Sequence, residues 1–490
     1  MEQNEFETLA QEYTAIPVSR RLMGDVSTPV SLFLKLRESG EYPFLLESVE
    51  GGEQLARYSF LGRNPYQVLH FKDNAVTLKK DGNIRKELDQ NYFDALEELT
   101  TAYREPNLPE LPRFTGGAVG FSSYDTVREI EDLPKPPPAE LTLPEAIWAF
   151  YDEIFAFDHV KRQVIIIKTV FMDGNRAAEQ HFENAQQRLD ELEEVIRQPI
   201  PEVTDFSFNP DNITSNYSRV SFEAMVRDAQ EHINKSEVLQ IVLSQRFQTS
   251  FKGDRFMLYR ALRMVNPSPY LYFLDFKDFS LIGSSPEVLV RVQEGTAQLL
   301  PIAGTRPRGD TEEEDQALET ELKNDPKELA EHHMLVDLGR KDLSRVCQSG
   351  TVETVRKQEV ERYSHVMHIV SDIKGQLSSK NSSVDALKWC FPAGTVSGAP
   401  KVRAMEIIDE LESTKRGPYA GAVGYFDFSG NMDTCIAIRT MIATESEIYI
   451  QAGAGIVAGS DPEKEFEETQ NKAGALIEAL SVALSIRKSN

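Results

Sequence analysis

Cysteine, tryptophan and long apolar runs are scarce in this sequence of 490 residues. Its three cysteines, Cys347, Cys390 and Cys435, are too few and too isolated for a disulfide framework or a zinc site. The longest apolar stretches, such as Val164–Ile167, fall far short of the roughly 20 residues that a membrane-spanning helix needs. The first residues are acidic and polar, unlike those of a signal peptide. We therefore expect a soluble cytoplasmic protein.

Basic residues are also in deficit. The sequence has 53 lysines and arginines against 78 aspartates and glutamates, a formal charge of −25. This balance disfavours binding to nucleic acid or to an anionic membrane by overall charge, although a local cationic pocket is compatible with it. The 40% hydrophobic content with 9% aromatics is sufficient for a sizeable core and argues against a disordered acidic chain.

One segment resembles a domain boundary. Residues 198–218 are rich in Pro, Asn, Ser and Thr and have no sustained hydrophobic period. We predict an N-terminal unit over residues 1–205 and a larger unit over 219–488. The larger unit should begin with a helix capped by Ser221, because apolar residues then recur with helical spacing. These residues are Phe222, Met225, Val226, Ala229 and Ile233.

Two predicted helices begin with the same pattern. Asp325-Pro326 opens the first and Asp461-Pro462 opens the second, with Asp as the cap and Pro at the first helical position. Each then carries two glutamates three residues apart, which places them on one helix face. These glutamates are Glu328 and Glu331 in the first helix, and Glu465 and Glu468 in the second.

If the two helices faced each other, four carboxylates would converge and would need a cation. Oxygen ligands with retained water suit Mg²⁺. A structural interpretation of each helix alone competes with this one. Asp325 and Glu328 have the spacing of a capping box, and Glu468 could pair with Lys472 four residues later.

Glycine-rich loops form a second group of candidate binding elements. Glycine allows backbone N–H groups to approach an anion closely, and nearby threonines and cations could add donors for carboxylates. No phosphate-binding or dinucleotide-binding glycine motif is present, so nucleotide binding is unsupported. For any single loop, ordinary turn chemistry is the better interpretation. The loops lie at residues 283–287, 301–309, 391–401 and 451–459.

In their order along the chain, these motifs resemble the chorismate-binding enzyme family. Within it, the sequence is similar to the large subunits of anthranilate synthases, known as component I. The resemblance implies an α+β fold of two orthogonally packed antiparallel β-sheets with helices on the outer faces. The motifs are GSSPE (283–287), PIAGTRPRG (301–309), KELAEHHMLVDLGRKDLSRV (327–346), HVMHIVSDIKG (365–375), FPAGTVSGAPK (391–401), RGPYAGAVGYF (416–426), IAIRTMI (436–442) and QAGAGIVAGSDPEKEFEETQNKA (451–473).

The resemblance assigns roles to these residues. Mg²⁺ would be bound by Glu331 and Glu468, with Glu328 and Glu465 holding its water shell. Glu287 would protonate the leaving C4 hydroxyl of chorismate, which requires a raised pKa. His368 would move a proton during pyruvate elimination, with His365 as the alternative. The implied substrate contacts are Gly304 and Thr305 near the ring carboxylate, Tyr419, Arg439, Gly453, Ala454 and Gly455 around the enolpyruvyl carboxylate, and Thr395 and Lys472 as further donors.

Two positions separate the members of the family. Aminodeoxychorismate synthases usually carry a nucleophilic lysine where this sequence has Ala303. Isochorismate and salicylate synthases carry a water-activating lysine at the position of Gln240, and an amide cannot take that proton. The resemblance therefore implies addition of ammonia to chorismate, followed by loss of pyruvate to give anthranilate. A close alternative is aminodeoxychorismate synthase component I, and a more distant one is a noncatalytic tryptophan-binding subunit.

The resemblance also implies partners. None of the cysteines lies in a G-x-C-x-G nucleophile turn, so a separate glutamine amidotransferase subunit, or free ammonia, must supply nitrogen. We expect a heteromeric complex, such as a heterotetramer. Tryptophan is the implied feedback inhibitor of this first committed step to tryptophan. Its implied site consists of Glu47, Ser48, Pro269, Tyr270 and Leu271.

Overall fold

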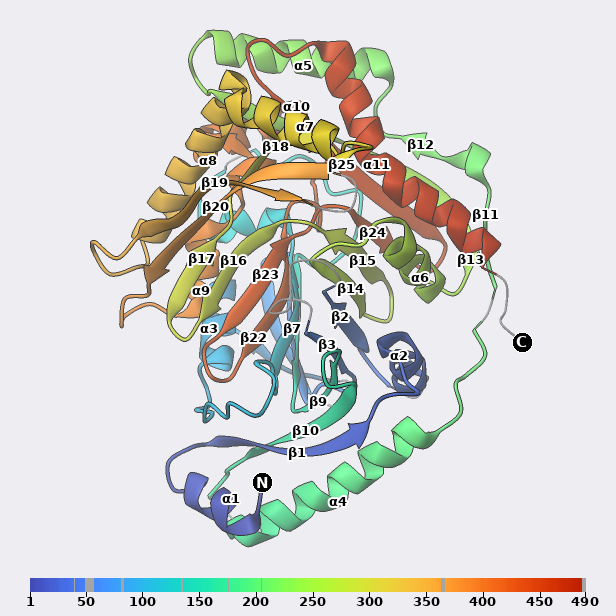
Figure 1. Ribbon diagram of the computed structural model, residues 1–490, viewed down its shortest axis with the longest axis vertical. Helices are drawn as coiled ribbons and strands as arrows, with labels where there is room; N and C mark the ends of the chain where they lie inside the picture. Colours follow the sequence, from blue (N-terminus) through green and yellow to red (C-terminus); the bar gives the residue numbers. More distant parts are fainter. Residues whose placement is uncertain are drawn as a thin grey trace.

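A computed structural model describes residues 1–38, 40–48, 57–80, 83–133, 135–174, 176–203, 205–362 and 366–486, with only the backbone of residues 83–86. Within these residues, two large antiparallel sheets are covered by helices, the α+β arrangement expected from the sequence (Figure 1). No helix in the described ranges is long and apolar enough to cross a membrane.

The first sheet runs in the order β1-β10-β9-β3-β2-β14-β15-β24-β25-β13-β11, and β12 and β21 also pair with β13. Its strands are β1 (Ala15–Met23), β2 (Phe44–Glu47), β3 (Tyr58–Gly62), β9 (Glu153–Asp158), β10 (Gln163–Phe171), β11 (Phe206–Phe208), β12 (Thr214–Ser215), β13 (Gln240–Gly253), β14 (Tyr270–Asp275), β15 (Ser280–Ser285), β21 (Gly398–Ala399), β24 (Thr440–Ala443) and β25 (Glu447–Ile456).

The second sheet runs in the order β18-β20-β17-β16-β23-β22-β7-β8-β4-β5-β6, and β19 pairs with β20. Its strands are β4 (Gln67–Lys72), β5 (Ala75–Lys80), β6 (Asn83–Leu88), β7 (Gly117–Ser122), β8 (Ala146–Tyr151), β16 (Val288–Gln293), β17 (Thr296–Leu299), β18 (Ile302–Pro307), β19 (Glu353–Arg362), β20 (Val366–Gln376), β22 (Ala422–Asp427) and β23 (Met432–Ile436).

The helices lie mainly on the outer faces of the sheets. In Figure 1, α4 lies with β1 and β10 at one end of the molecule, and α5 lies at the opposite end. The helices are α1 (Gln3–Leu9), α2 (Pro29–Arg37), α3 (Tyr92–Thr100), α4 (Ala178–Arg197), α5 (Arg219–Asn234), α6 (Phe256–Val265), α7 (Glu312–Asn324), α8 (Pro326–Ser344), α9 (Ser383–Cys390), α10 (Lys401–Leu411) and α11 (Pro462–Ser485), with 3₁₀ turns η1 (Tyr124–Glu129), η2 (Pro210–Asn212) and η3 (Gly394–Val396).

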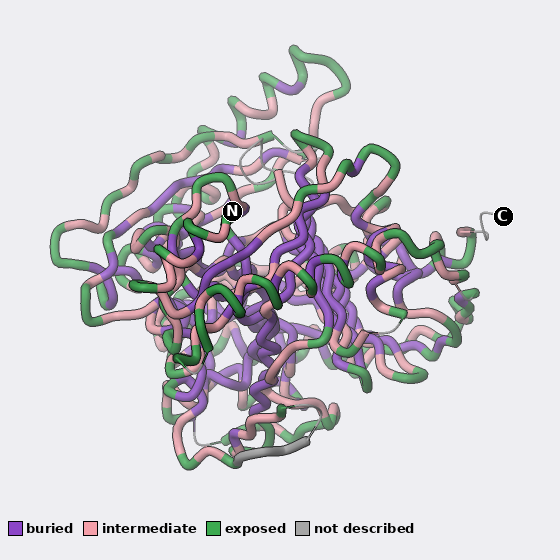
Figure 2. Tube along the Cα trace, turned by 90° about the horizontal axis from the view of Figure 1, so that it is seen from below, coloured by how far each residue is buried: buried purple, intermediate pink, exposed green. Residues whose placement is uncertain are grey.

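Three main layers of apolar side chains hold this arrangement together. One fills the space between the sheets and includes Phe44, Phe121 and Ile442. The other two lie between the sheets and their covering helices. Figure 2 shows the buried residues concentrated along the interior strands, with exposed residues on the outer helices and turns. Burial of apolar area, at about 25 cal/mol per Å², is the main stabilising contribution.

The segments before and after the predicted boundary share both sheets. In the first sheet β2 pairs with β14, and in the second sheet β7 pairs with β22. Residues 1–205 and 219–488 therefore meet along two strand ladders, and elements far apart in sequence lie side by side. The boundary segment itself contributes β11 and β12, which both pair with β13.

The helix that follows the boundary begins earlier than predicted. Ser218, and not Ser221, caps α5, because the Ser218 hydroxyl accepts a hydrogen bond from the Ser221 backbone N–H. The three residues before the apolar stripe fit the first helical turn, so Ser221 lies inside the helix. The predicted apolar stripe from Phe222 to Ile233 is buried, as expected.

Candidate active site

Glu287 lies in the short connection between β15 and β16. The Thr395 hydroxyl, at η3, donates a hydrogen bond to Glu287 Oε1 at 2.8 Å. Burial raises the pKa of Glu287 to about 7, although the Thr395 hydrogen bond and the charge of Lys472 oppose the shift. A carboxyl group with this pKa is substantially protonated near neutral pH and can serve as a proton donor.

Gly304, Thr305 and His368 come together where β18 pairs with β20. Thr305 is the register partner of His368, and its hydroxyl lies 3.1 Å from His368 Nδ1. His368 Nδ1 is also 2.9 Å from the Gly304 carbonyl oxygen. Because a carbonyl only accepts, Nδ1 carries the proton in that bond, which leaves Nε2 as the basic nitrogen of the neutral ring. Burial lowers the pKa of His368, so the neutral form dominates at pH 7. His365 lies outside the described residues.

The two acidic helices begin as the sequence predicts. The Asp325 side chain accepts hydrogen bonds from Lys327 and Glu328 backbone N–H groups, and Asp461 accepts one from Glu463. Proline follows each cap at the first helical position. These local signals explain why both helices present their glutamates in the first turns.

The four glutamates of these helices have polar partners within the protein. Glu328 forms an ion pair with Arg306 at 3.3 Å, and Glu468 pairs with Lys472 at 2.6 Å. The second of these pairs is the local contact anticipated from the sequence spacing. Burial raises the pKa values of Glu331 and Glu465, and the neighbouring Gln240 and Ser460, respectively, oppose these shifts.

The charges of the two helices act on each other. Burial, and then the charge of Glu328, raises the pKa of Glu331, while Lys472 of α11 lowers it. Burial, and then Glu468, raises the pKa of Glu465, while Lys327 of α8 lowers it. The two helix starts therefore lie within electrostatic reach of each other, with a lysine from each helix near the carboxylates of the other.

Magnesium binding can be tested against this donor set. Across the described ranges, no three acidic, histidine or cysteine side chains lie close enough together to hold a metal ion. The chemistry of the donors nevertheless fits Mg²⁺, because it consists of carboxylate oxygens. The two glutamates of each helix repel each other, and a bound divalent cation would offset this repulsion.

Tyr419 is buried, and the half-buried Arg439 lies within electrostatic reach of it. The Tyr419 hydroxyl is so close to Gly453 that a Cβ there would lie 2.6 Å from it. Burial lowers the pKa of Arg439, and within the described residues its guanidinium forms no ion pair; it donates to the Lys472 carbonyl oxygen. A guanidinium that is shielded from water and has no ion pair favours an anionic ligand. Lys472 also donates to the Gly453 carbonyl at 3.1 Å.

Sequence reasoning missed the roles of Arg306 and Gln240 in this charge network. Arg306 contacts Asp325 and Glu328, which are about 20 residues away in sequence. Gln240, on β13, lowers the pKa of Glu331 against the larger effect of burial, and a Cβ on Gly455 would lie 2.7 Å from its side-chain amide nitrogen. The PIAGTRPRG motif contains Arg306, but only the packing of β18 against α8 identifies its partners.

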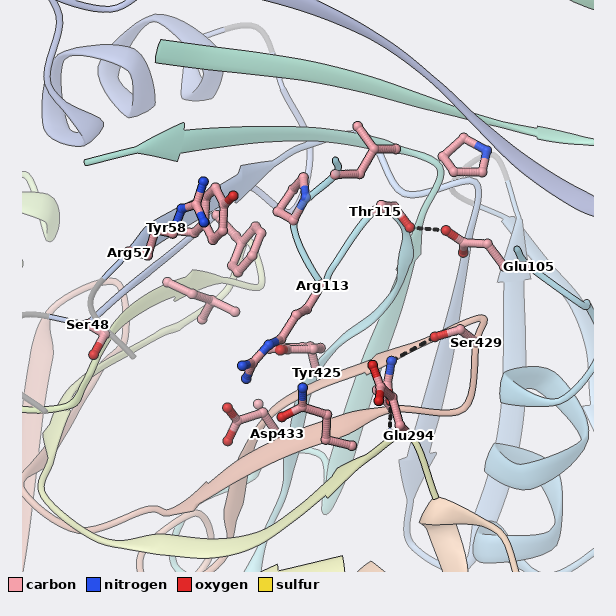
Figure 3. A pocket seen from close by; sticks show the side chains of 18 of the residues that line it. Ser48, Arg57, Tyr58, Glu105, Arg113, Thr115, Glu294, Tyr425, Ser429 and Asp433 are labelled. Atoms are coloured by element: carbon pink, nitrogen blue, oxygen red, sulfur yellow. Dashed lines mark hydrogen bonds between the residues drawn. The ribbon is translucent and has the colours of Figure 1, made fainter. Parts of the chain in front are cut away.

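The five residues predicted to bind tryptophan line a separate cavity of about 950 Å³, formed by strands of both sheets. Leu271 is the register partner of Glu47, which brings β2 and β14 together at its wall. Glu47 is buried and accepts hydrogen bonds from Tyr259 at 2.5 Å, from Arg263 at 3.1 Å, and from Ser59 at 3.4 Å. Figure 3 shows side chains surrounding this space from several strands.

Comparisons with known proteins agree with these observations. The family model described as chorismate binding enzyme matches residues 42–478. Anthranilate synthase component 1 from Acetivibrio thermocellus is 46% identical, with 99% of each chain covered. The protein of the same name from Synechocystis is 45% identical, with 97% of this chain and 98% of the relative covered.

Solved structures are similar as well. Anthranilate synthase component I from Streptococcus pneumoniae is 37% identical, with a TM-score of 0.78 over 94% of this chain and 99% of the other. The menaquinone-specific isochorismate synthase from Escherichia coli has a TM-score of 0.69 and covers 98% of each chain. At 20% identity, the second structure shows only that the fold is shared.

Proposed function

The chain belongs to the chorismate-binding enzyme family, and we propose that it is the large subunit of an anthranilate synthase, converting chorismate and ammonia into anthranilate and pyruvate. Relatives of this name are 42–46% identical over nearly the whole chain. Within the site, the observation that carries the proposal is Glu287, a half-buried residue beside Thr395 whose pKa burial raises to about 7.

The first chemical step is amination. Ammonia forms a bond to C2 of chorismate while the C4 hydroxyl leaves as water, and Glu287 donates the proton to that leaving group. The Thr395 hydroxyl holds the Glu287 carboxyl group in place through its hydrogen bond to Oε1. Ala303 cannot form a covalent adduct with the ring, and the Gln240 amide cannot take a proton from water. These two residues support ammonia as the nucleophile.

The carboxylates of chorismate require separate anchors. Arg439 and the Tyr419 hydroxyl suit the enolpyruvyl carboxylate, because one supplies a charge-assisted donor and the other a neutral donor. The backbone of Gly453, Ala454 and Gly455 lies alongside this pair. Gly304 and Thr305 lie beside His368, on the side proposed for the ring carboxylate.

Elimination of pyruvate completes the reaction and makes the ring aromatic. His368 is suited to moving the proton in this step, because its neutral form is favoured and its Nδ1–H is held by the Gly304 carbonyl. The orientation of the His368 imidazole ring thus leaves Nε2 as its proton-accepting nitrogen.

Mg²⁺ is the proposed metal cofactor. Glu331 and Glu468 would hold it directly, and Glu328 and Glu465 would hold its water shell. When bound, Mg²⁺ neutralises and orients the ring carboxylate of the substrate. Lys472 and Arg306 already balance Glu468 and Glu328, respectively, in the protein alone.

A second subunit is proposed to supply ammonia from glutamine. The three cysteines are buried, so none is placed to act as the nucleophile of a glutaminase. The name component 1 of the relatives indicates an assembly with another component. A heterotetramer in the cytoplasm, inhibited by tryptophan through the cavity beside Glu47 and Ser48, completes the proposal.

A direct assay tests the activity. Purified chain with chorismate, Mg²⁺ and ammonium should form fluorescent anthranilate without a further enzyme. Product that appears only after addition of a separate lyase would instead identify an aminodeoxychorismate synthase. Absence of chorismate consumption in the presence of ammonium and Mg²⁺ would contradict an enzymatic role. Addition of EDTA should stop the reaction, and restored Mg²⁺ should recover it.

A further inference from the structure

A cluster of three polar side chains, with Arg291 buried and Tyr270 and Asp433 half-buried, connects the two sheets. The Tyr270 hydroxyl donates to Asp433 Oδ1 at 2.7 Å, and Arg291 Nε donates to Asp433 Oδ2 at 3.0 Å. Arg291 Nη2 also donates to the Tyr270 hydroxyl oxygen at 2.7 Å. We call Tyr270, Arg291 and Asp433 the cross-sheet triad. Each member contacts the other two, so displacement of one side chain disturbs both remaining contacts.

The triad lies at a junction of the fold. Tyr270 begins β14 in the first sheet, whereas Arg291 and Asp433 are register partners on β16 and β23 in the second. The Arg291 side chain is 9% exposed and that of Asp433 is 16% exposed. Breaking a pair of charges buried to this extent is costly, because it leaves an uncompensated charge. The triad therefore fixes the position of β14 against β16 and β23.

One side of the triad faces the cavity of about 950 Å³ that is proposed to bind tryptophan. Tyr270 and Asp433 both line it, together with Glu47 and Leu271. Figure 3 shows Asp433 and Tyr425 extending into this space from their strands. A ligand in the cavity that offers a hydrogen-bond donor can compete with the Tyr270 hydroxyl for the Asp433 carboxylate.

The same strands lead to the catalytic acid. Glu287 immediately precedes β16, and its carbonyl oxygen accepts the Ile436 N–H at 3.0 Å, at the end of β23. Tyr270 is the register partner of Ser285, whose hydroxyl donates to the Ile436 carbonyl at 2.7 Å. The Ser285 hydroxyl also accepts the Glu287 N–H at 3.3 Å.

The proposed substrate anchor Arg439 is tied to this connection as well. Its carbonyl oxygen accepts the Ser284 N–H at 3.0 Å, next to Ser285. Between the triad and Glu287, the pairing of β16 with β23 shifts register from Val288 to Val290. Such an irregularity bends a strand and re-aims the residues beside it. The triad is thus connected through strand pairing and hydrogen bonds to both Glu287 and Arg439.

We propose that Arg291 and Asp433 are positioning residues that couple occupancy of the cavity to the geometry of Glu287 and Arg439. The inference rests on the proposed function, in which the cavity binds tryptophan. In this structure the triad joins β14 to the paired strands β16 and β23, with Glu287 beside Thr395. A bound ligand that draws Asp433 away from Tyr270 favours a second arrangement, in which chorismate binds more weakly.

The substitution Arg291→Lys tests this coupling. Lysine keeps the positive charge but cannot contact Asp433 and Tyr270 through a planar fork. Calorimetry gives the Kd of tryptophan, and steady-state kinetics give the KM for chorismate with and without tryptophan. The coupling factor is the ratio by which bound tryptophan weakens the binding of chorismate, and it is typically about 5–150. In Arg291→Lys we expect the Kd of tryptophan to change by less than about threefold, while this coupling factor falls toward 1. By reciprocity, chorismate should lose its effect on tryptophan binding to the same extent.

Arg128→Lys is the matched control. Arg128 makes a two-pronged ion pair with Asp409 at 2.9 Å on both arms, away from the triad. The Arg128→Lys variant should lose about as much stability as Arg291→Lys, and it should keep the coupling factor of the unmodified chain. If Arg291→Lys does not fold, Tyr270→Phe replaces it, because that change removes a single hydroxyl group.

The outcomes separate the two proposals. If the unmodified chain forms no anthranilate, the proposed function is contradicted. If it is active but tryptophan does not inhibit it, the proposed tryptophan site is contradicted. Either result overturns the coupling. Inhibition of the unmodified chain together with an undiminished coupling factor in Arg291→Lys, or in Tyr270→Phe where it is used, overturns the coupling alone. Loss of coupling in Arg128→Lys as well would assign the effect to general stability and also overturn it.

Discussion

Two glutamates in this protein, Glu287 and Glu47, have similar positions and different chemical surroundings. Both follow or end a strand; Glu47 is buried and Glu287 is half-buried. Glu47 accepts hydrogen bonds from Tyr259, Arg263 and Ser59, whereas Glu287 accepts a single side-chain hydrogen bond, from Thr395, within the described part of the chain.

The difference in donors explains a difference in task. An arginine and two hydroxyl groups hold the Glu47 side chain in place in the wall of the cavity. Glu287 lacks such compensation, and burial raises its pKa to about 7. The comparison teaches that a glutamate surrounded by donors is suited to anchoring a cavity wall, whereas a glutamate with few donors and a raised pKa is suited to transferring a proton.

Glu287→Gln should have the largest effect. Glutamine keeps the shape and the Thr395 contact but cannot transfer a proton, so kcat should fall by about 100- to 10,000-fold. Glu105→Gln is the control, because burial also raises the pKa of Glu105, to about 8, and Thr115 donates to it in the lining of the separate cavity. Anthranilate fluorescence measures both variants. Equal activity of Glu287→Gln and the unmodified chain would remove Glu287 from the reaction.

Glu468→Gln should have the next largest effect. It removes one proposed charged ligand of Mg²⁺, and activity should fall by at least about 100-fold with poor rescue by excess Mg²⁺, because a metal supplies several kcal/mol of charge stabilisation. Glu467→Gln changes the neighbouring exposed residue of the same helix and should behave as the unmodified chain. Titration of activity against Mg²⁺ distinguishes the two, and identical titrations would exclude Glu468 as a ligand.

Local features of the active site were predictable from the sequence, because they depend on neighbouring residues. Asp325-Pro326 and Asp461-Pro462 predict both helix starts, and the i, i+4 spacing of Glu468 and Lys472 predicts their ion pair. The cap of α5 was misplaced by three residues, since two serines with the right side chain stand one turn apart.

Long-range partners were not predictable from the residues alone. Arg306 meets Glu328 only because β18 packs against α8. Tyr270 and Asp433 are 163 positions apart and belong to different sheets. The family resemblance supplied the expected site and fold, but the polar partners of each residue follow from strand register, which a single sequence does not determine.

Glu47→Gln should have a smaller effect, confined to regulation. The amide removes the charge that pairs with Arg263 and faces the cavity, so the concentration of tryptophan needed for half inhibition should rise by about tenfold, the effect of losing roughly 1.4 kcal/mol of binding. Glu41→Gln is the control, because Glu41 is exposed and pairs with Lys277. Unchanged tryptophan inhibition of Glu47→Gln would place the inhibitor elsewhere.

Thr395→Val should have the smallest and most specific effect, on the pH profile. Glu287 must be protonated to act, so kcat/KM of the unmodified chain should decline as the pH rises above about 7. The Thr395 hydrogen bond stabilises the charged carboxylate and lowers the pKa of Glu287; without it the pKa rises, and the alkaline decline should move up by as much as about one pH unit. Ser397→Ala, in the same loop but bonded to the Ala393 carbonyl, should leave the decline where it is. A shift toward lower pH in Thr395→Val would mean that the working form of Glu287 is the carboxylate, and its role would become that of a base.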